Sequence, residues 1–514
     1  MRPKIIDANQ AAELIEDGQT LCIGGGGAGH AVPDKLMEAL GKRFVKTSSP
    51  RQLKILHPCG IGENNVRGLN HLAHEGLADT VIGGFWGNAP SMGKLAMENK
   101  IKGYNFPQGV LGHLMRSAAG GEEGLLKKTG LHTFVDPRYE GGKVNDITKE
   151  DLVDLVNING YEFLFYHTIP VDVAFIRGTS IDKEGNLTME DEVATFAMLS
   201  VAQSARVNGG IVIAQVKKQN YEHAKPVQVK VPAVMIDYVV MVPDQTMTFI
   251  TDWEEAFIDR NAKYKTETLS LSGIKRIIAR RASLELSKNS FVNLGYGIPD
   301  GVPIVANEEG VLSEITFMIE QGQTDGVIAT GLNFGAMYNP AIIVDDPYQF
   351  DFFHGGGLDI CYLGFAQVDQ FGNVNASRFN QHFTGSGGFI DISQNTKKVV
   401  FCGAFAAKSD IDVSESGLTV NSPGKFKKFI KQVEQITFNG QYATKRDQEV
   451  LYCTERAVFR LIEGGIELIE IAPGINLERD IISMMEFEPR ISDELKTMNS
   501  KIFSNELLGL KNWK

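Results

Sequence analysis

The chain has 514 residues and a formal net charge of −12 at pH 7, with 43% hydrophobic and 22% charged residues. This length exceeds what one hydrophobic core holds, and the composition is globular, so two or more large domains are expected. The acidic balance argues against a nucleic-acid partner, because phosphate recognition needs a concentrated basic surface.

The N-terminal segment, MRPKIIDANQAAELIEDG, carries charges throughout and lacks the apolar core of a signal peptide. No apolar run approaches the roughly 18 residues of a membrane span. Five cysteines occur without a close pair, and Cys361 and Cys402 lie in apolar runs, so reduced and mostly buried thiols are expected. Together these features predict a cytoplasmic protein with no membrane partner.

Short apolar runs alternate with amphipathic helical patterns along the chain, as in LCIGGG followed by DKLMEALGKRF. This alternation predicts an α/β fold with largely parallel sheets. Two segments, VDVAFIRGTSIDKEGNL (171–187) and LDICYLGFAQVDQFGNV (358–374), align without a gap. Earlier in each half of the chain stands a Gly-rich turn that ends in Pro-Asp. We therefore predict two homologous α/β domains, residues 1–255 and 256–514, the first enlarged around residues 73–149.

The junction between the domains is expected in the polar, non-periodic segment from Pro243 to Ser270. The segment that follows, GIKRIIARRASLEL, has helical spacing and begins the second half of the chain. Its KRIIARRA stretch predicts a helix with one solvated basic face.

Four glycine clusters could direct backbone N–H groups at an anion. Each cluster also fits a tight strand-to-helix turn without a ligand, and none matches a P-loop or a complete dinucleotide fingerprint. The clusters are Gly24 to Gly27 with Gly29, Gly295 with Gly297, Gly355 to Gly357, and Gly385 with Gly387 and Gly388.

Two histidines in HLAHEG, His71 and His74, are three residues apart on an expected helix, with Glu75 beside them. Catalytic zinc needs a third ligand and usually a different spacing, so a surface helix is favoured over a metal site. No nucleophile elbow of a serine hydrolase occurs either, although members of a triad can be distant in sequence.

The stretch TFMIEQGQTDG places the carboxylate of Glu320 directly after an apolar run that predicts a buried strand. A charged residue is also an ordinary way to end a strand. However, a glutamate with a pKa of about 4.3 is more than about 99% ionised at neutral pH. Glu320 could therefore attack an electrophile without a base or a metal, if N–H groups of a Gly-rich loop hold the resulting oxyanion.

Nearly the whole chain resembles the class I (family I) CoA-transferases, most of all the single-chain acetate and propionate CoA-transferases with two fused homologous domains. The resemblance implies two homologous open α/β domains of the CoA-transferase (NagB/RpiA/CoA-transferase-like) type. The matching stretches are IGGGGAGHAVPD, YNFPQG at Tyr104 to Gly109, HTFVDPR at His132 to Arg138, GGKVNDITKEDLV, FHGGGLDICYLG, TGSGGFID and EQITFNG at Glu434 to Gly440.

In that family the nucleophile is the glutamate of a Glu-x-Gly motif, which here is Glu320 in the second domain. The resemblance implies a ping-pong transfer of CoA between a short-chain acyl-CoA and a free carboxylate such as acetate, propionate, lactate or butyrate, through a glutamyl-CoA thioester. CoA is then substrate and covalent carrier, with no metal or other cofactor, and the family usually forms homodimers or homotetramers.

Family loops also imply roles for glycines and one glutamine. The loops that match LGYGIP and TGSGGF imply contacts with CoA and the oxyanion from Gly295, Gly297, Gly385, Gly387 and Gly388. The first domain, on the acyl side, would contribute Gly25, Gly26, Gly27 and Gln108, whereas the second domain would provide most CoA contacts.

The chain departs from the family after the Glu-x-Gly motif. Relatives continue with an apolar residue and Gly-Gly, whereas Gln321, Gln323, Thr324 and Asp325 make this loop polar, so the acyl preference stays open. Two alternatives remain at this point. One is an acyl-CoA hydrolase, if the polar loop admits water, and the other is a non-catalytic small-molecule sensor of the same fold.

Overall fold

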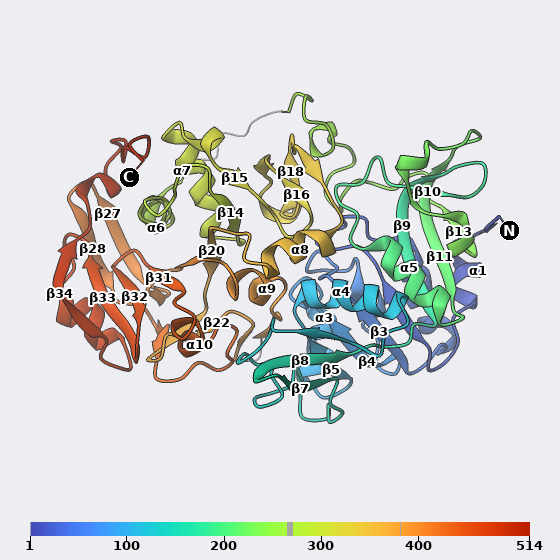
Figure 1. The fold of residues 1–514 in the computed structure, drawn as a ribbon, viewed down its shortest axis with the longest axis horizontal. Helices are drawn as coiled ribbons and strands as arrows, with labels where there is room; N and C mark the ends of the chain where they lie inside the picture. The colour runs from blue at the N-terminus through green and yellow to red at the C-terminus, as the bar shows by residue number, and fades with distance from the viewer. Residues whose placement is uncertain (1, 265–270, 381, 514) are drawn as a thin grey trace. The chain divides into compact units, whose positions relative to one another are not determined.

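A computed structural model describes residues 2–264, 271–380 and 382–513 of the chain (Figure 1). The chain forms two compact units: unit 1 comprises Met1–Tyr264, Ile319–Asp351 and Asn380–Asp391, and unit 2 comprises Lys265–Met318, Phe352–Phe379 and Ile392–Lys514. The first passage between units falls inside the predicted junction, of which residues 265–270 lie outside the described residues. The division at residue 255 stays a prediction, because compact units and homologous halves need not coincide.

Unit 1 is built on a parallel sheet in the order β1-β13-β11-β9-β2-β3-β4-β5. Every residue of the central strand β9 is buried, as expected for a parallel strand covered on both faces. The strands are β1 (Lys4–Ile6), β2 (Thr20–Ile23), β3 (Leu53–His57), β4 (Ala78–Gly83), β5 (Lys102–Asn105), β9 (Val173–Ile181), β11 (Ile211–Gln219) and β13 (Tyr238–Met241), with β10 (Leu187–Thr188) and β12 (Val229–Val231) attached.

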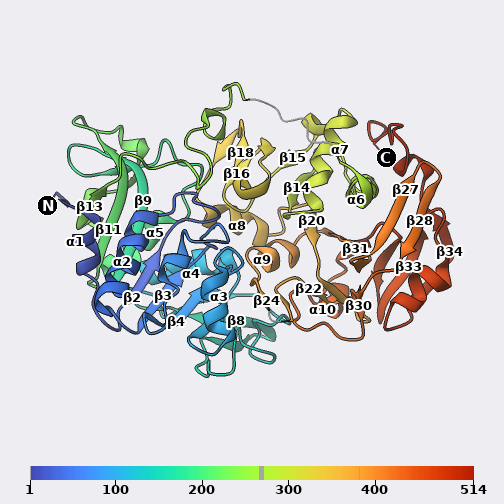
Figure 2. The same ribbon diagram turned by 180° about the vertical axis from the view of Figure 1, so that it is seen from behind.

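Helices cover both faces of this sheet. Leu21 and Ile23 of β2 share one buried cluster with residues of α1 (Ala8–Glu13), α2 (Asp34–Thr47) and α3 (Pro90–Met97). Cys22 points the other way, with its Sγ 3.7 Å from Met115 Sδ of α4 (Gln108–Ala119). Helix α5 (Met198–Val207) packs beside α4, so unit 1 has three layers, seen from opposite sides in Figure 1 and Figure 2.

Shorter elements complete unit 1. An antiparallel sheet is formed by β6 (Gly124–Lys127), β8 (Tyr161–His167) and β7 (Val153–Ile158). Two small pairs follow, β16 (Gln323–Thr324) with β19 (Ile342–Ile343), and β17 (Val327–Ile328) with β18 (Met337–Tyr338). Helices α8 (Asp346–His354) and α9 (Phe389–Ser393) begin in unit 1 and end in unit 2.

Unit 2 contains a sheet in the order β15-β14-β20-β25-β31-β32-β33-β34, parallel as far as β31. Helices α6 (Gly273–Ser283), α7 (Val302–Glu308) and α10 (Gly440–Thr444) accompany it. The strands are β15 (Thr316–Phe317), β14 (Phe291–Leu294), β20 (Ile360–Gly364), β25 (Lys398–Cys402), β31 (Glu449–Cys453), β32 (Ala457–Ile462), β33 (Gly465–Ile471) and β34 (Arg490–Thr497). Smaller strands are β21 (Gln367–Asp369), β22 (Val374–Asn375), β23 (Arg378–Phe379), β24 (His382–Phe383, in unit 1), β26 (Ala406–Ala407), β27 (Asp410–Ser414), β28 (Gly417–Ser422), β29 (Phe426–Lys427) and β30 (Phe429–Ile430).

The internal repeat is visible in the strand order. The neighbours β3-β2-β9-β11-β13 of unit 1 correspond to β15-β14-β20-β25-β31 of unit 2, and every pair is parallel. The two similar sequence segments supply β9 in one case and β20 with β21 in the other. The expectation of two homologous open α/β domains is therefore confirmed.

Matched aspartates make the same hydrogen bonds in both copies. Asp172 Oδ2 accepts from the N–H of Thr20 at 2.8 Å, and Asp359 Oδ2 accepts from the N–H of Phe291 at 2.9 Å. In each case the aspartate before the central strand holds the first residue of its neighbour. The repeated aspartate therefore sets the register of the strand pair that precedes the Gly-rich turn.

The prediction that α6 exposes a basic face to solvent is wrong. Arg280 and Arg281 are buried, with exposed fractions of 1% and 4%. Arg280 donates to the backbone oxygens of Lys501 and Ile502, and Arg281 donates to Glu470 at 2.7 Å. Helical spacing identified the helix, but the partners that accept these guanidinium groups come from the distant C-terminal segment.

The five cysteines are buried and free, as the sequence predicts. Among the described residues, no helix is long and apolar enough to cross a membrane.

Candidate active site

Glu320 lies in a tight turn. The N–H of Gly322 donates to the Ile319 oxygen at 3.1 Å, so Glu320 and Gln321 are the two central residues. The preceding strand β15 ends at Phe317 and not at Ile319, directly before Glu320, so the expected strand end is corrected by two residues. A turn presents the carboxylate on a fixed backbone, with the buried Ile319 behind it.

The turn is anchored by Gly322. This residue has a φ of +101°, and a Cβ atom there would lie 2.0 Å from the backbone oxygen of Val344. The N–H of Val344 donates to the Gly322 oxygen at 3.0 Å, and β16 then pairs with β19. Only glycine fits this position, which explains physically why a glycine follows the carboxylate by two residues.

Two buried carboxyl groups act on Glu320. Although the Glu320 side chain keeps some solvent exposure, desolvation, followed by the charges of Asp391 and Asp346, raises its pKa to about 8. A hydrogen bond from Gln321 Nε2 to Glu320 Oε1, 3.1 Å long, opposes this shift. The inference that Glu320 is almost fully ionised at neutral pH is therefore wrong for this structure, because its environment disfavours the anion.

Asp346, the first residue of α8, is buried with an exposed fraction of 1%. Desolvation and the charge of Asp345 raise its pKa to about 7. Its Oδ2 atom lies 3.6 Å from the thiol of Cys59, whose own pKa is raised by burial and by the charges of Asp346 and Glu320. Glu320, Asp346 and Cys59 therefore form one electrostatically coupled group.

Asp391 holds the start of helix α4. Its Oδ2 atom accepts from the N–H of Gly109 at 3.0 Å, and the residue before the helix, Pro107, offers no side-chain cap. A Cβ atom at Gly109 would lie 2.8 Å from Asp391 Oδ1. Asp391 thus connects the helix that begins at Gln108 with the carboxyl groups around Glu320.

The segment TGSGG is joined to the first-domain loops by backbone hydrogen bonds. The N–H of Gly387 donates to the Gly84 oxygen at 2.9 Å, and the N–H of Gln108 donates to the Gly387 oxygen at 3.0 Å. The N–H of Ser386 donates to Asn105 Oδ1 at 2.9 Å. Gly385 and Gly387 have positive φ values of 76° and 54°. These contacts bring the predicted residues Gln108, Gly385 and Gly387 together, with Gly388 next to them in the chain.

Gln108 combines burial with a free donor. Its side chain has an exposed fraction of 3%, and Nε2 has no hydrogen-bond acceptor among the residues that the structure describes. A buried amide N–H without an acceptor costs about 1–3 kcal/mol, so a ligand oxygen that met it would be stabilised. This property fits a residue that contacts the acyl group or an oxyanion.

The glycine loop before α2 lies against Cys59. A Cβ atom at Gly26 would lie 3.0 Å from Cys59 Cβ and 2.5 Å from the Phe196 ring. Gly25 and Gly27 have φ values of +97° and +57°. The loop of Gly25, Gly26 and Gly27 therefore contacts Cys59, whose thiol lies against Asp346 and is acted on by the charge of Glu320.

Gly295 and Gly297 belong to unit 2, after β14. The N–H of Gly295 donates to the Tyr362 oxygen at 2.8 Å, and Gly297 has a φ of +100°. Their predicted contacts with CoA stay predictions.

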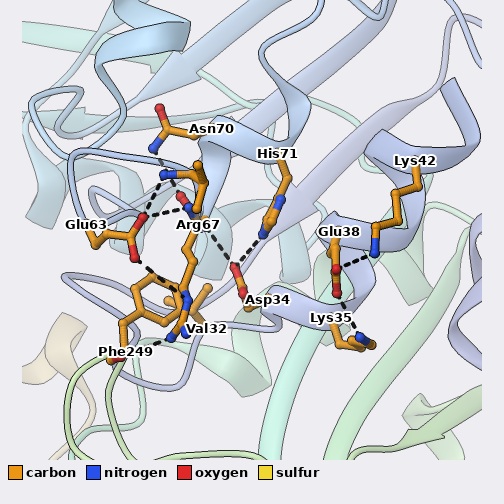
Figure 3. A network of polar contacts seen from close by, with 12 residues as sticks. Val32, Asp34, Lys35, Glu38, Lys42, Glu63, Arg67, Asn70, His71 and Phe249 are labelled. Atoms are coloured by element: carbon orange, nitrogen blue, oxygen red, sulfur yellow. Dashed lines mark hydrogen bonds and ion pairs between the residues drawn. The ribbon is translucent and has the colours of Figure 1, made fainter. Parts of the chain in front are cut away.

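In the HLAHEG stretch, His71 lies against a carboxylate of helix α2 and not in a metal site (Figure 3). The helix expected there is a short 3-10 turn, Leu69–Leu72, so His74 and Glu75 lie outside it. His71 Nε2 lies 3.3 Å from Asp34 Oδ1, which also accepts from the N–H of Gly68 at 2.7 Å. Within the described parts of the chain, no three His, Cys, Asp or Glu side chains are grouped to bind a metal ion.

Sequence-based reasoning missed three buried side chains: Asp346 and Asp391, whose charges act on Glu320, and His30, which lies against Gly335. Both ring nitrogens of His30 lack hydrogen-bond partners among the described residues, and burial and the charge of Arg177 lower its pKa to about 4. Asp391 lies in TGSGGFID, and His30 lies in IGGGGAGHAVPD, so both stand within quoted stretches. Asp346 follows another aspartate in an unremarkable DDP sequence, and no local signal marks it.

Comparison with known proteins defines the class. The coenzyme A transferase family profile matches residues 5–241. The acetate CoA-transferase YdiF of Escherichia coli (strain K12) is 43% identical over 99% of this chain and 96% of its own length. The caffeate CoA-transferase of Acetobacterium woodii is 42% identical over 99% of this chain and 98% of its own. The chain belongs to the coenzyme A transferase family.

A solved structure supports the same assignment. The crystal structure of the acyl-CoA transferase YdiF from Escherichia coli O157:H7, described as a thioester complex with CoA, superposes with a TM-score of 0.94 at 41% sequence identity. It covers 99% of this chain and 97% of that chain. The CoA-transferase fold expected from the sequence is therefore confirmed.

Proposed function

We propose that this enzyme transfers CoA between a short-chain acyl-CoA and a free carboxylic acid, with Glu320 as the nucleophile. The observation that carries the assignment of Glu320 is its position in a hydrogen-bonded turn, together with buried polar atoms of Gln321 and Asp346 that have no hydrogen-bond partner among the described residues. The full-length similarity to named CoA-transferases and to a thioester complex supports the reaction class.

The chemistry proceeds in balanced steps. The Glu320 carboxylate attacks the thioester carbonyl, and the C–S bond breaks to give a glutamyl-acyl anhydride and CoA thiolate. The thiolate then attacks the glutamyl carbonyl and releases the first acid, leaving a glutamyl-CoA thioester. An acceptor carboxylate repeats these steps in reverse, so no net proton transfer is required.

The protein's own residues stabilise charge during these steps. Gln108 Nε2 is positioned as a donor to an oxyanion, and the backbone of Gly385, Gly387 and Gly388 is proposed to contribute further donors. Gly25, Gly26 and Gly27 are proposed to line the acyl side, and Gly295 and Gly297 to contact CoA. One donor to an oxyanion is typically worth about 3–4 kcal/mol of barrier.

The same proposal names the acids that the enzyme uses and the molecules that it binds. Acetate, propionate, lactate and butyrate are the candidate acids, and acyl-CoA and the free acid are the partners. We also propose a homodimer or homotetramer in the cytoplasm, with no cofactor besides CoA. The acidic composition supports the absence of a nucleic-acid partner.

The test is the intact mass of the protein after incubation with acetyl-CoA and no acceptor acid. A CoA-sized gain that maps to Glu320, and that is lost in Glu320→Gln, is expected. CoA release that does not depend on an acceptor acid, without an adduct, would favour an acyl-CoA hydrolase. Binding without any turnover would favour a sensor.

A further inference from the structure

The ammonium group of Lys428 has no counter-ion of its own. Its Nζ atom donates to the backbone oxygen of Phe365 at 2.6 Å and lies 4.1 Å from the centroid of the Phe365 ring. In the parts of the chain that the structure describes, Lys428 forms no ion pair with a carboxylate. Burial lowers its pKa to about 8, and the charge of Glu455 opposes this shift.

Glu455 is already engaged by other groups. Its Oε1 atom accepts from Arg456 Nε at 3.1 Å, and its Oε2 atom accepts from the N–H of Phe405 at 2.8 Å. A lysine ammonium carries three donors, and the Phe365 oxygen takes one of them. An anion that met the remaining donors of Lys428 would therefore be stabilised by charge-assisted hydrogen bonds.

Lys428 lies at the carboxyl edge of the parallel strands of unit 2. Its contact residue Phe365 comes directly after β20, and Gly295 comes directly after the neighbouring strand β14. The strand order reverses between these two strands, because β15 lies on one side of β14 and β20, β25 and β31 lie on the other. In open α/β sheets, ligands bind outside the carboxyl ends of the strands at such a switch point.

The segment that contains Lys428 is basic in an acidic protein. GKFKKFIK, residues 424–431, has four lysines and no acidic residue, whereas the chain has a net charge of −12. The N–H of Val368 donates to the Lys428 oxygen at 2.8 Å, and Val368 pairs with Phe429, so the segment is fixed beside the loop that follows β20. Lysines concentrated at the ligand edge of a sheet favour a ligand with several negative charges.

We propose that Lys428 binds a phosphate group of CoA and so holds the nucleotide end of the substrate. The inference rests on the proposed use of CoA as a substrate. That end of CoA carries a pyrophosphate and a 3′-phosphate, whose oxygens accept the N–H groups of Lys428 and supply the negative charge that its surroundings lack. The contact is remote from the thioester, so it strengthens the binding of CoA thioesters whichever acid they carry.

The experiment compares three acetyl donors with one acceptor acid: acetyl-CoA, acetyl-3′-dephospho-CoA and acetyl-pantetheine, which has no phosphate. Lys428→Gln removes the charge and keeps an N–H donor for the Phe365 oxygen. It is expected to lose at least about tenfold in kcat/KM with acetyl-CoA, as the loss of a charged hydrogen bond would give, and to match the wild type with acetyl-pantetheine. A loss that persists with the dephospho donor assigns the contact to the pyrophosphate, and a loss confined to acetyl-CoA assigns it to the 3′-phosphate.

Lys397→Gln is the matched control, because it removes the same charge at the opposite edge of the same sheet. Lys397 comes directly before β25 and is exposed, with its Nζ atom 2.7 Å from Asp359 Oδ1. Its kcat/KM is expected to match the wild type with all three donors. An equal loss with all three donors in folded Lys428→Gln, or no loss with acetyl-CoA, overturns the proposal.

A measurement on the wild-type enzyme serves if Lys428→Gln does not fold. Acetylation of Lys428 by acetic anhydride, followed by peptide mass mapping, is expected to slow when CoA is present and to keep its rate with pantetheine. No protection by CoA, or equal protection by pantetheine, overturns the contact.

Calorimetry of CoA binding to Glu320→Gln, with and without Lys428→Gln, separates this inference from the proposed function. An adduct on Glu320 in the wild type, together with an unchanged affinity for CoA, overturns the role of Lys428 and leaves CoA transfer standing. Weaker CoA binding in the double variant, without an adduct in the wild type, supports the phosphate contact and refutes CoA transfer. Neither binding nor an adduct overturns both.

Discussion

The rate at which Glu320 forms its CoA thioester should depend strongly on pH. Burial, Asp391 and Asp346 raise the pKa of Glu320 to about 8. The ionised fraction is then about 1% at pH 6, about 9% at pH 7 and about half at pH 8. Because only the carboxylate attacks, the rate should rise about tenfold between pH 6 and pH 7 and level off above pH 8.

The assay is a rapid acid quench of enzyme mixed with subsaturating acetyl-CoA and no acceptor, followed by intact mass measurement at each pH. Asp346→Asn serves as the internal test, because removal of this charge should lower the pKa of Glu320 and so lower the pH at which the rate levels off. Titration of CoA phosphates would give the same profile in both proteins. A rate that is constant from pH 6 to 9 would refute the idea that the surrounding carboxyl groups hold the nucleophile protonated.

Three further predictions concern the residues that position the site. Gly322→Ala should lower the free energy of unfolding by at least about 2 kcal/mol and abolish adduct formation, measured by urea unfolding and mass, since the new Cβ would collide with Val344. Asp391→Ala should cost about 1–3 kcal/mol by leaving the Gly109 N–H unpaired, whereas Asp391→Asn should keep an acceptor; equal losses in both would contradict the capping role. Since folding raises the pKa of Asp346 to about 7, the native state binds this proton more tightly, and stability should fall as pH rises from about 4 to about 7 by up to about 4 kcal/mol. Asp346→Asn should remove this component from denaturant midpoints measured across pH; an unchanged pH slope would count against it.

The sequence alone predicted the features that depend on local pattern. Alternating apolar runs predicted parallel strands, and the repeated Asp and Gly-Asn segments predicted two homologous domains, whose strand neighbours match in the structure. The resemblance to the family's Glu-x-Gly motif singled out Glu320, and the structure gives the physical reason for the glycine of that motif, because the turn needs a positive φ at Gly322. Likewise, the glycines of TGSGG marked a loop that does contact the helix beginning at Gln108.

Tertiary structure alone decided the electrostatics. Asp346 and Asp391 are distant from Glu320 in sequence, and only folding places their charges where they disfavour its ionisation. The same reason explains the error at α6, where helical spacing was right but the acceptors for Arg280 come from residues beyond 500. Local pattern determines the conformation of a segment, whereas the protonation of a buried group depends on every charge and dipole that the fold brings near it, and these determine how the carboxylate of Glu320 behaves.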